Sequence, residues 1–329
     1  MQPLISVILP AYNAGPYIAD AVNSILNQTF TNFELIIVND CATDNTEEEI
    51  LKFTDPRIRY YKNEENKGLV YTLNKLITLA KGKYLARMDA DDISINTRFE
   101  KQINYLEQNP EVGIVSCAFQ NFGNSNETVY YKQHNNDIKL NLLYKTEVCH
   151  AAALIRTSLA TSHTPFYNSK YVHAEDYELW ARMTLHTQFY NLQEVLYKVR
   201  IVSTSVSRVY TNIQQENAYA VIRYLFNRFN ITLTDNELNT WLQFCYANFD
   251  LNSAEIKLLD GLLNALVQNN KTVHYIDQTY LEQYLAEKWF HMCYNNAKNK
   301  EVKTIFNNSK ISALLPLKSR FKFRLKGLV

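Results

Sequence analysis

Residues 4–13 form the segment LISVILPAYN, a short apolar run that stops at Pro10 and passes into a polar loop. A strand is predicted to end at this proline, because proline has no N–H to give to a neighbouring strand. Gly15-Pro16 then introduces a helical pattern that reaches Leu26. This opening part of the chain therefore predicts a strand, a loop and a helix.

The same alternation continues along the chain, and short strands separated by helices are typical of α/β domains with a mostly parallel sheet. Further strands are predicted at 33–38, 57–61 and 84–88, and helices at 44–53 and 69–80. Beyond them we predict a helix at 97–108, a strand at 112–119, a loop or hairpin at 123–136, a helix at 177–186 and one or two strands at 189–202.

The pattern becomes helical almost throughout from about residue 210, with apolar residues at three- and four-residue spacing. Helices are predicted here at 219–229, 237–249, 254–267 and 280–294. We place the boundary near residue 208, which gives an α/β domain over 1–208 and an all-helical C-terminal domain over 209–329. Four aromatic residues of the helical domain look exposed and suggest ligand binding, oligomerisation or membrane docking: Tyr275, Tyr280, Tyr284 and Trp289.

The composition excludes several classes of protein. Lys and Arg number 34 against 33 Asp and Glu, so a net charge of +1 provides no general attraction to nucleic acid. The five cysteines are scattered and lack C-x-x-C spacing, which argues against a zinc site or a disulfide framework and favours a reducing compartment. No apolar run approaches the roughly 18 residues of a membrane span. We expect a cytoplasmic protein, at most peripheral at the inner face of the membrane.

The last twenty residues are basic and apolar without any acidic residue. Lysines and arginines at 310, 318, 320, 322, 324 and 326 are interleaved with leucines and phenylalanines. Such a tail suits contact with anionic lipid, because each basic side chain near the surface contributes about 1 kcal/mol. A solvated or docked C-terminal segment is the alternative interpretation.

Polar residues follow three of the predicted strands. In an open parallel sheet, ligands bind outside the carboxyl ends of the strands. An aromatic ring such as Tyr12 can stack on a base, and a carboxylate such as Asp40 can accept a hydrogen bond from the N–H groups of uracil or guanine. The three strand ends, which together predict a nucleoside pocket, are Pro10-Ala11-Tyr12-Asn13, Asn39-Asp40 and Asp89-Ala90-Asp91-Asp92.

The third strand end carries three carboxylates within four residues, Asp89, Asp91 and Asp92. Such a cluster repels itself unless a cation neutralises it. Mg²⁺ or Mn²⁺ held by one or two carboxylates completes its shell with water and substrate phosphate oxygens. The alternative is a solvated acidic turn in which Asp91 or Asp92 caps the following helix.

Five motifs in order closely resemble the family 2 inverting glycosyltransferases with the GT-A fold, a Rossmann-like arrangement. The resemblance spans roughly residues 4–205 and implies transfer of a sugar from a nucleotide diphosphate donor, with UDP favoured, to an acceptor hydroxyl. Its bacterial members suggest a glycan or lipid-linked glycan as acceptor. The motifs are Ser6-Val7-Ile8-Leu9-Pro10-Ala11-Tyr12-Asn13, Asn39-Asp40 with Asp44, Asn66-Lys67-Gly68, Asp89-Ala90-Asp91-Asp92 and Glu175-Asp176-Tyr177-Glu178-Leu179-Trp180.

The resemblance also implies roles for single residues. Asp91 would ligate Mn²⁺ or Mg²⁺, with Asp92 as nearby support. Asp176 would be the general base that takes the acceptor proton, and Glu175 would orient or supplement it. The nucleotide would be bound by Pro10, Ala11, Tyr12, Asp40, Lys67, Asp89 and Ala90. A charged first turn of a helix through Trp180 is the structural alternative for Glu175-Asp176.

Three further residues are candidates for the acceptor or the phosphates. His150 stands where relatives often carry a histidine before an apolar strand, although a lone histidine is more often structural. In Leu196-Tyr197-Lys198-Val199-Arg200, Arg200 takes the place of the histidine of a Tyr-Arg-x-His pattern that is frequent in relatives. A third metal ligand from this strand is therefore not expected, and Arg200 or Arg208 would pair with the diphosphate instead.

Two other functional classes are alternatives. A haloacid dehalogenase phosphatase carries an Asp-x-Asp motif, but that motif closes the first strand of its domain, whereas Asp89-x-Asp91 follows the fourth predicted strand. A relative that binds a nucleotide or glycan without turnover is the other. The first loop lacks the glycine pattern of a dinucleotide oxidoreductase, and residues 89–94 lack the central glycine of a calcium loop.

Overall fold

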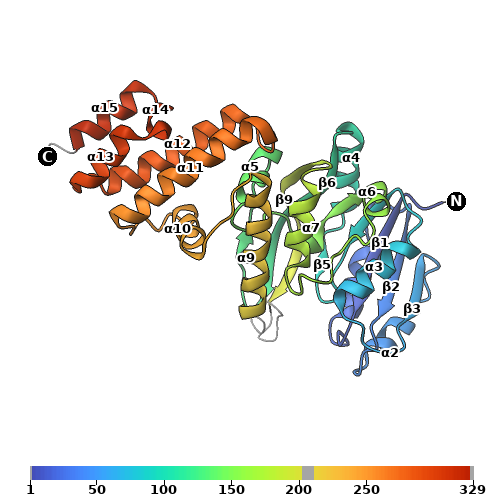
Figure 1. Cartoon of the computed structure of the whole chain (residues 1–329). Coiled ribbons are helices and arrows are strands. Elements are labelled where there is room, and N and C mark those ends of the chain that lie inside the picture. Colours follow the sequence, from blue (N-terminus) through green and yellow to red (C-terminus); the bar gives the residue numbers. More distant parts are fainter. Residues whose placement is uncertain (1, 202–210, 327–329) are drawn as a thin grey trace. The chain divides into compact units, whose positions relative to one another are not determined.

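The computed structural model describes residues 2–201 and 211–326, which fall into two compact units (Figure 1). The first unit comprises Met1–Ile138 and Thr146–Ala218, and the second comprises Lys139–Lys145 and Tyr219–Val329. The predicted boundary at residue 208 lies outside the described residues. The short segment 139–145 groups with the helical unit, which no local sequence pattern indicated.

The first unit contains the predicted α/β alternation, and the α/β fold class is confirmed. Its elements are β1 (Ile5–Ala11), α1 (Ile18–Leu26), β2 (Phe33–Asn39), α2 (Thr46–Leu51), β3 (Ile58–Lys62), α3 (Leu69–Leu79), β4 (Tyr84–Arg87), β5 (Ile93–Ser94), α4 (Arg98–Gln108), β6 (Val112–Gly123), β7 (Thr128–Val129), α5 (Asn135–Asn141), η1 (His150–Ala152), β8 (Leu154–Arg156), α6 (Thr157–Ser162), α7 (Glu175–Met183), β9 (Gln188–Ile201) and the start of α9 (Thr211–Arg228).

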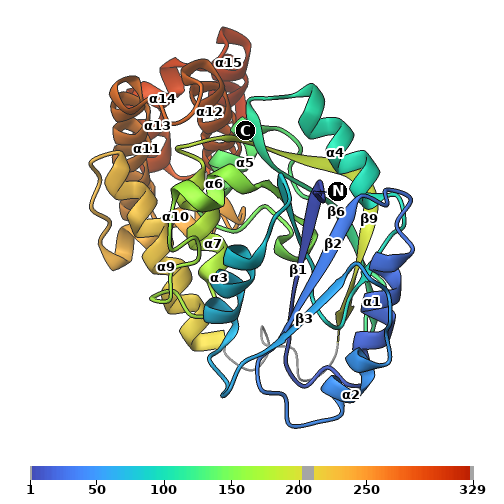
Figure 2. The same ribbon diagram turned by 90° about the vertical axis from the view of Figure 1, so that its right-hand side faces the viewer.

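The strands form one mixed sheet in the order β3-β2-β1-β4-β8-β6-β9-β5, with β7 paired to β6. The half made by the first four strands is parallel, whereas β8 runs antiparallel to both β4 and β6. Helices α1 and α3 lie on opposite faces of the parallel half (Figure 2). Strands covered on both faces must be apolar on both, which explains why their sequences are continuous apolar runs.

Strands β5 and β8 show no periodicity of their own in the sequence because they are very short. β5 has two residues and β8 has three, too few to show a period. The segment predicted at 189–202 as one or two strands is a single strand, β9, paired in parallel with β6 and interrupted by register shifts near Cys117 and Ala118.

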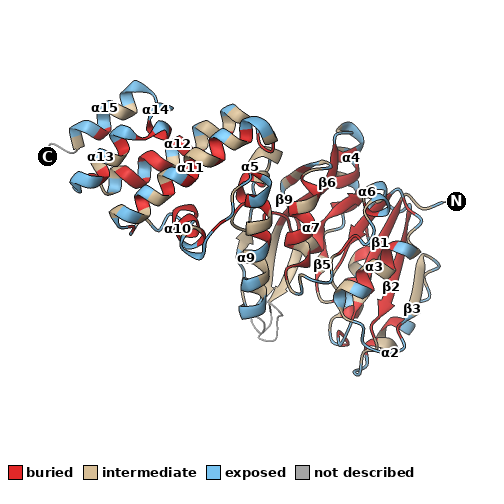
Figure 3. Cartoon of the chain, in the orientation of Figure 1, coloured by how far each residue is buried: buried red, intermediate tan, exposed pale blue. Residues whose placement is uncertain are grey.

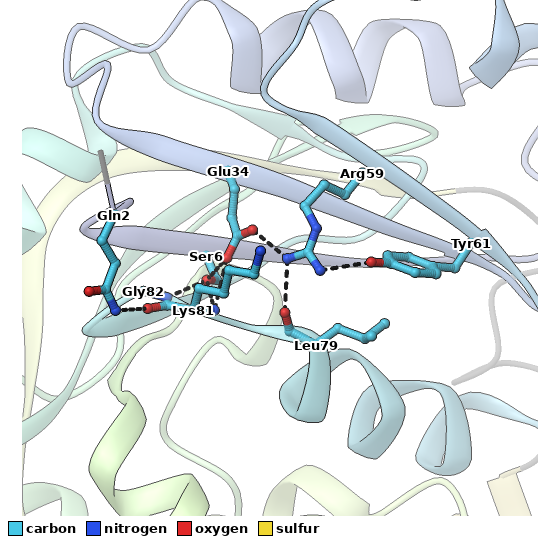
Figure 4. Close-up of polar contacts among 8 residues, drawn as sticks. All are labelled: Gln2, Ser6, Glu34, Arg59, Tyr61, Leu79, Lys81 and Gly82. Carbon is cyan, nitrogen blue, oxygen red and sulfur yellow. Dashed lines mark hydrogen bonds and ion pairs between the residues drawn. The ribbon is translucent and has the colours of Figure 1, made fainter.

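A buried polar network holds the amino ends of the parallel strands together (Figure 4). Ser6 Oγ donates to Glu34 Oε1 at 2.6 Å, and Glu34 Oε2 accepts from Arg59 Nη1 at 2.5 Å. The amides of Lys81 and Gly82 donate to the same two side chains, which ties the turn before β4 to β1 and β2. A Cβ at Gly82 would come within 2.5 Å of the Ser6 amide nitrogen, so glycine is required there. The carboxyl ends of the strands are thereby left for the site.

The helical unit has its own apolar core (Figure 3). Its main helices are α10 (Asp235–Cys245), α11 (Ser253–Val273), α12 (Gln278–Asn295), α13 (Lys300–Asn308), α14 (Lys310–Ala313) and α15 (Leu317–Lys326). The sequence interpretation of Trp289 and Tyr275 as exposed is wrong, because both rings are buried in this core. Trp289 Nε1 donates to Ser312 Oγ at 2.8 Å, which satisfies its one polar atom. Tyr280 and Tyr284 are half-buried.

The C-terminal segment predicted as a mixed basic tail forms helices α14 and α15. Phe323 of α15 is buried and stacks on Phe306 of α13, with ring centroids 3.7 Å apart. Within the described residues, no helix has the length and apolar character needed to span a bilayer.

Candidate active site

A pocket of about 440 Å³ opens at the carboxyl ends of β1, β2 and β4. The predicted nucleotide residues other than Lys67, together with the predicted metal ligand Asp91, all line it. The polar loops after three neighbouring strands meet here because the strands are parallel and in register. The lining residues are Pro10, Ala11, Tyr12, Asn13, Ala14, Tyr17, Asp40, Asn66, Gly68, Leu69, Thr72, Asp89, Ala90 and Asp91.

Asp40 is buried at the floor of this pocket and organises the loop before α3. Its Oδ1 accepts from Asn63 Nδ2 at 2.6 Å and from the Lys67 amide at 2.9 Å. Its Oδ2 accepts from the Gly68 amide at 2.8 Å. A carboxylate offers about four acceptor positions, so these three bonds leave room on Oδ2 for one more donor.

Lys67 is placed differently from the other predicted nucleotide residues. Its side chain is exposed and forms an ion pair with Glu65, and it is absent from the pocket lining. Its backbone amide, rather than its ammonium group, contributes to the site by holding Asp40. Gly68 has a φ of 82°, a conformation that favours glycine, and it lets the chain turn directly into α3.

Hydrogen bonds join the loop after β1 to the loop after β2. Asn13 Oδ1 accepts from the Thr43 amide at 2.9 Å, and Asp44 Oδ2 accepts from the Gly15 amide at 2.9 Å. This leaves the Tyr12 side chain 49% exposed at the rim of the pocket. An exposed ring held on a fixed loop is available to stack on a flat ligand.

The acidic turn after β4 is compensated only in part by protein groups. Burial, followed by the charges of Asp89 and Asp91, raises the pKa of Asp92 well above its ordinary value. Arg87 is buried on β4 and forms an ion pair with Asp89. Asp92 is buried and accepts from the Arg200 amide at 2.7 Å and from the Tyr197 hydroxyl. Across the described ranges, no three Asp, Glu, His or Cys side chains are grouped so that they could hold a metal ion by themselves.

Asp91 lines the pocket from this turn, as Asp89 does. Burial, followed by the negative charge of Asp89, raises the pKa of Asp91 to about 6. The positive charges of Arg87 and Arg200 act in the opposite direction but do not outweigh burial and the charge of Asp89. Mg²⁺ and Mn²⁺ are commonly held by one or two carboxylates together with substrate phosphate oxygens, so the pair Asp91 and Asp89 fits such an ion.

Arg200 on β9 supports the acidic turn. Its guanidinium lies over the rings of Tyr17 and Phe122, 4.4 Å from each centroid, and its Nε donates to the Asp91 carbonyl at 2.8 Å. The predicted partner Arg200 therefore lies beside the turn, although it is absent from the pocket lining. The other predicted arginine, Arg208, lies outside the described residues.

Glu175 and Asp176 form the charged first turn of helix α7, which runs through Trp180. Burial, followed by the charge of Glu175, raises the pKa of Asp176 to about 7, and burial also raises the pKa of Glu175. Asp176 Oδ1 accepts from the Tyr177 amide at 2.7 Å. Within the helix, Arg182 makes a two-point ion pair with Glu178, and its Nη2 also donates to the Phe166 carbonyl at 2.6 Å, which ties the helix to the preceding loop. A carboxyl group with a pKa near neutrality is suited to accept a proton in a reaction.

Arg87 was not predicted as a site residue, although it is buried beside the predicted carboxylates. Its positive charge acts on Asp91 after β4 and on Glu175 and Asp176 at the start of α7, where it lowers the pKa values against the effect of burial. These acidic groups therefore share one buried counter-charge. The sequence does contain a signal for this residue, because Arg87 stands alone in the apolar run 84–88. A charged residue on a buried strand requires a partner of opposite charge nearby.

His150 lies close to the same charge. Its Nε2 is 2.8 Å from the Tyr167 hydroxyl, and burial, followed by Arg87, lowers the pKa of His150 well below its ordinary value. The ring is therefore neutral at physiological pH. Tyr167 is held in turn by two hydrogen bonds to the Asn74 side chain, at 2.9 and 3.0 Å.

Comparisons with known proteins identify similar chains. A family model described as glycosyl transferase family 2 matches residues 6–170. An uncharacterized glycosyltransferase of Haemophilus influenzae is 34% identical over 249 residues, covering 70% of this chain and 77% of that protein. The Escherichia coli UDP-Glc:alpha-D-GlcNAc-diphosphoundecaprenol beta-1,3-glucosyltransferase WfaP is 29% identical over 258 residues, covering 76% of this chain and 99% of that protein. The crystal structure of S. aureus TarS 1-349 in complex with UDP-GlcNAc has a similar fold, with a TM-score of 0.60, 17% identity, and coverage of 95% of this chain and 91% of that one.

Proposed function

The chain belongs to glycosyl transferase family 2 and is a glycosyltransferase of the GT-A fold, and from this premise we propose that it transfers a sugar from a UDP-sugar to an acceptor hydroxyl with inversion. The observation that carries the proposal is the pocket at the carboxyl ends of β1, β2 and β4. It combines an exposed aromatic ring, a buried acceptor and a pair of carboxylates, which match a base, its N–H edge and a divalent cation that would bind the diphosphate.

The donor end of the proposal rests on Tyr12 and Asp40. Tyr12 stacks on the base, and the remaining acceptor position of Asp40 Oδ2 takes the imide N–H of uracil. The printed names of two similar proteins support UDP, since WfaP uses UDP-Glc and TarS was solved with UDP-GlcNAc. Asp89, on the same rim, is assigned to the ribose.

Asp91, with Asp89 beside it, is the residue that would hold Mn²⁺ or Mg²⁺. When bound, such an ion stabilises the negative charge of the departing diphosphate as a Lewis acid. Arg200 positions this turn through the Asp91 carbonyl and the Asp92 carboxylate. We therefore assign Arg200 to the support of Asp91, in place of the direct contact with the diphosphate that the sequence suggested.

Asp176 is assigned as the general base. The acceptor oxygen attacks the anomeric carbon on the face opposite the diphosphate, and the bond from that carbon to the phosphate oxygen breaks with its electron pair leaving on the diphosphate. The acceptor proton passes to the Asp176 carboxylate. A pKa of about 7 makes Asp176 a stronger base than an ordinary aspartate while much of it is still ionised near neutral pH. Glu175 maintains that basicity through its negative charge.

The acceptor is assigned to a bacterial glycan under assembly, carried on a lipid. The name of WfaP describes a sugar linked through diphosphate to undecaprenol, and this similarity supports the same class of acceptor here. His150, neutral and bonded to Tyr167, is assigned to the border of the acceptor site as a hydrogen-bonding group.

The test is nucleotide release from UDP-, GDP- and dTDP-sugars with Mn²⁺, measured for the wild type and for Asp176→Asn. We expect the wild type to release UDP from at least one UDP-sugar, and the variant to lose at least a hundredfold in rate while its calorimetric affinity for UDP is unchanged. Glu194→Gln, which removes an exposed carboxylate on β9, is the matched control and keeps full activity.

Two results would contradict the proposal. Full activity of Asp176→Asn would remove Asp176 as the base. UDP binding without turnover for the whole donor panel, even with lipid-linked acceptors added, would identify a binding protein instead of an enzyme.

A further inference from the structure

Helix α15 exposes an apolar stripe on its outer face. Leu317, Phe321 and Leu325 are 76%, 62% and 49% exposed, and their four-residue spacing places them in one row along the helix. The core-facing side of the same helix is occupied by Phe323, which is buried against Phe306. The exposed stripe is therefore additional to the face that holds the helix in the unit.

Basic residues border this stripe on both sides. At about 100° per residue, Arg320 and Arg324 fall on one side of the row, and Lys318 and Lys322 fall on the other. Lys322 also lies over the Tyr294 ring, 5.3 Å from its centroid, which marks where the basic border meets the body of the unit. A hollow of about 430 Å³ is lined by both kinds of side chain, namely Leu317, Lys318, Arg320, Phe321 and Arg324.

The chemistry of this surface selects among partners. Residues 310–329 contain no acidic side chain, so a second copy of the same surface would bring like charges together. A nucleic acid would use the basic border and leave the apolar row in water. An anionic bilayer uses both, because the apolar row enters the boundary between headgroups and acyl chains while the basic side chains stay beside the phosphates.

We propose that the α15 surface, formed by Leu317, Phe321 and Leu325 with Lys318, Arg320 and Arg324, binds the helical unit to an anionic lipid bilayer. This inference goes beyond sugar transfer, since it states how the chain reaches a membrane on which a lipid-linked acceptor would be held. It does not depend on the residues assigned to the reaction.

The experiment is co-sedimentation of the full chain with vesicles of phosphatidylcholine alone and of phosphatidylcholine with phosphatidylglycerol at three to one. Binding is expected on the mixed vesicles and weak on the neutral ones. Each basic residue near an anionic surface strengthens binding about fivefold, so neutralising three should weaken it on the order of a hundredfold. This charge variant is Lys318→Gln with Arg320→Gln and Arg324→Gln. The apolar variant, Leu317→Ser with Phe321→Ser and Leu325→Ser, should weaken binding at least tenfold.

Matched controls use exposed residues elsewhere in the helical unit. Tyr246→Ser removes another exposed ring, 60% exposed at the end of α10, and should bind vesicles as the wild type does. The charge control, Lys257→Gln with Lys271→Gln and Lys298→Gln, should lose much less binding than the α15 charge variant. Circular dichroism confirms that every variant is folded, and donor hydrolysis by the α15 variants should be unchanged.

The outcomes separate this proposal from its rivals and from the proposed function. Equal binding to neutral and anionic vesicles, or full binding by both α15 variants, overturns it. It is also overturned if sedimentation velocity shows a lipid-free dimer that the apolar variant abolishes while vesicles are not bound. Vesicle binding requires no turnover, so an inactive protein that still binds would contradict the proposed function alone.

Discussion

Replacing Asp176 by asparagine should stabilise the protein at neutral and alkaline pH while it removes activity. The ionised carboxylate is costly in the folded state, because burial and the charge of Glu175 raise its pKa to about 7 from an ordinary 3.8. Asparagine has a similar shape and can still accept from the Tyr177 amide, but it carries no charge to desolvate. A residue held in an unfavourable ionised state for its reactivity is expected to weaken the fold.

The magnitude follows from linkage. Each pH unit between the folded and unfolded pKa values is worth about 1.4 kcal/mol, so the interval from 3.8 to about 7 corresponds to at most about 4 kcal/mol. The folded pKa is the higher one, so the cost is absent below the unfolded value, grows as pH rises and is complete above the folded value. The gain for Asp176→Asn should be about 4 kcal/mol at pH 8.5 and about 2 kcal/mol at pH 5.

Urea unfolding followed by circular dichroism at pH 5, 7 and 8.5 measures this gain as the difference between variant and wild type. Taking the difference at each pH cancels the contributions of titrating groups that do not interact with residue 176. Glu48→Gln, which removes an exposed carboxylate on α2, is the control and should change stability by less than about 0.5 kcal/mol at every pH. A variant that is less stable than the wild type at pH 8.5, or a gain that does not grow with pH, would refute the reasoning.

Three further predictions concern the site. The kcat/KM of the wild type should rise with pH, with a midpoint near 7, as Asp176 ionises. Glu175→Gln should move that midpoint to lower pH because the Glu175 charge raises the Asp176 pKa, and an unmoved midpoint in pH-rate profiles contradicts the assignment. Arg200→Ala should weaken UDP binding in the presence of Mn²⁺ about tenfold by calorimetry, whereas Lys198→Ala on the same strand should not, and equal effects would remove Arg200 as a support of the turn. Asp40→Asn should destabilise the protein by about 1–3 kcal/mol in urea unfolding and abolish measurable UDP binding, because an NH₂ group would then face a donor; wild-type affinity would exclude Asp40 from the base site.

Much of the fold and the donor pocket follows from local sequence. A strand covered on both faces must be apolar along its length, so 33–38 and 84–88 were recognisable without the structure. Parallel strands end at the same edge of the sheet, and this rule alone places Tyr12, Asp40 and Asp89 near one another.

The structure was needed to show which partner each charged or aromatic side chain has. The ion pair of Arg87 with Asp89 and the hydrogen bond from the Arg200 amide to Asp92 depend on which groups point inward, and the sequence showed only the cluster of carboxylates. Lys67 turns away to Glu65 although its neighbours line the pocket. The burial of Trp289 likewise depends on the later helix α14 packing over it.

The amino-acid sequence by itself therefore determined the alternation of strands and helices and the set of polar residues at the strand ends, because periodicity and chain breakers are local properties. The tertiary structure alone decided which charged groups pair with one another, which carboxylates line the pocket, and which face of α15 remains uncovered. These depend on the approach of segments separated by tens of residues, and the electrostatic energy of a buried group is set by the neighbours that such approaches bring to it.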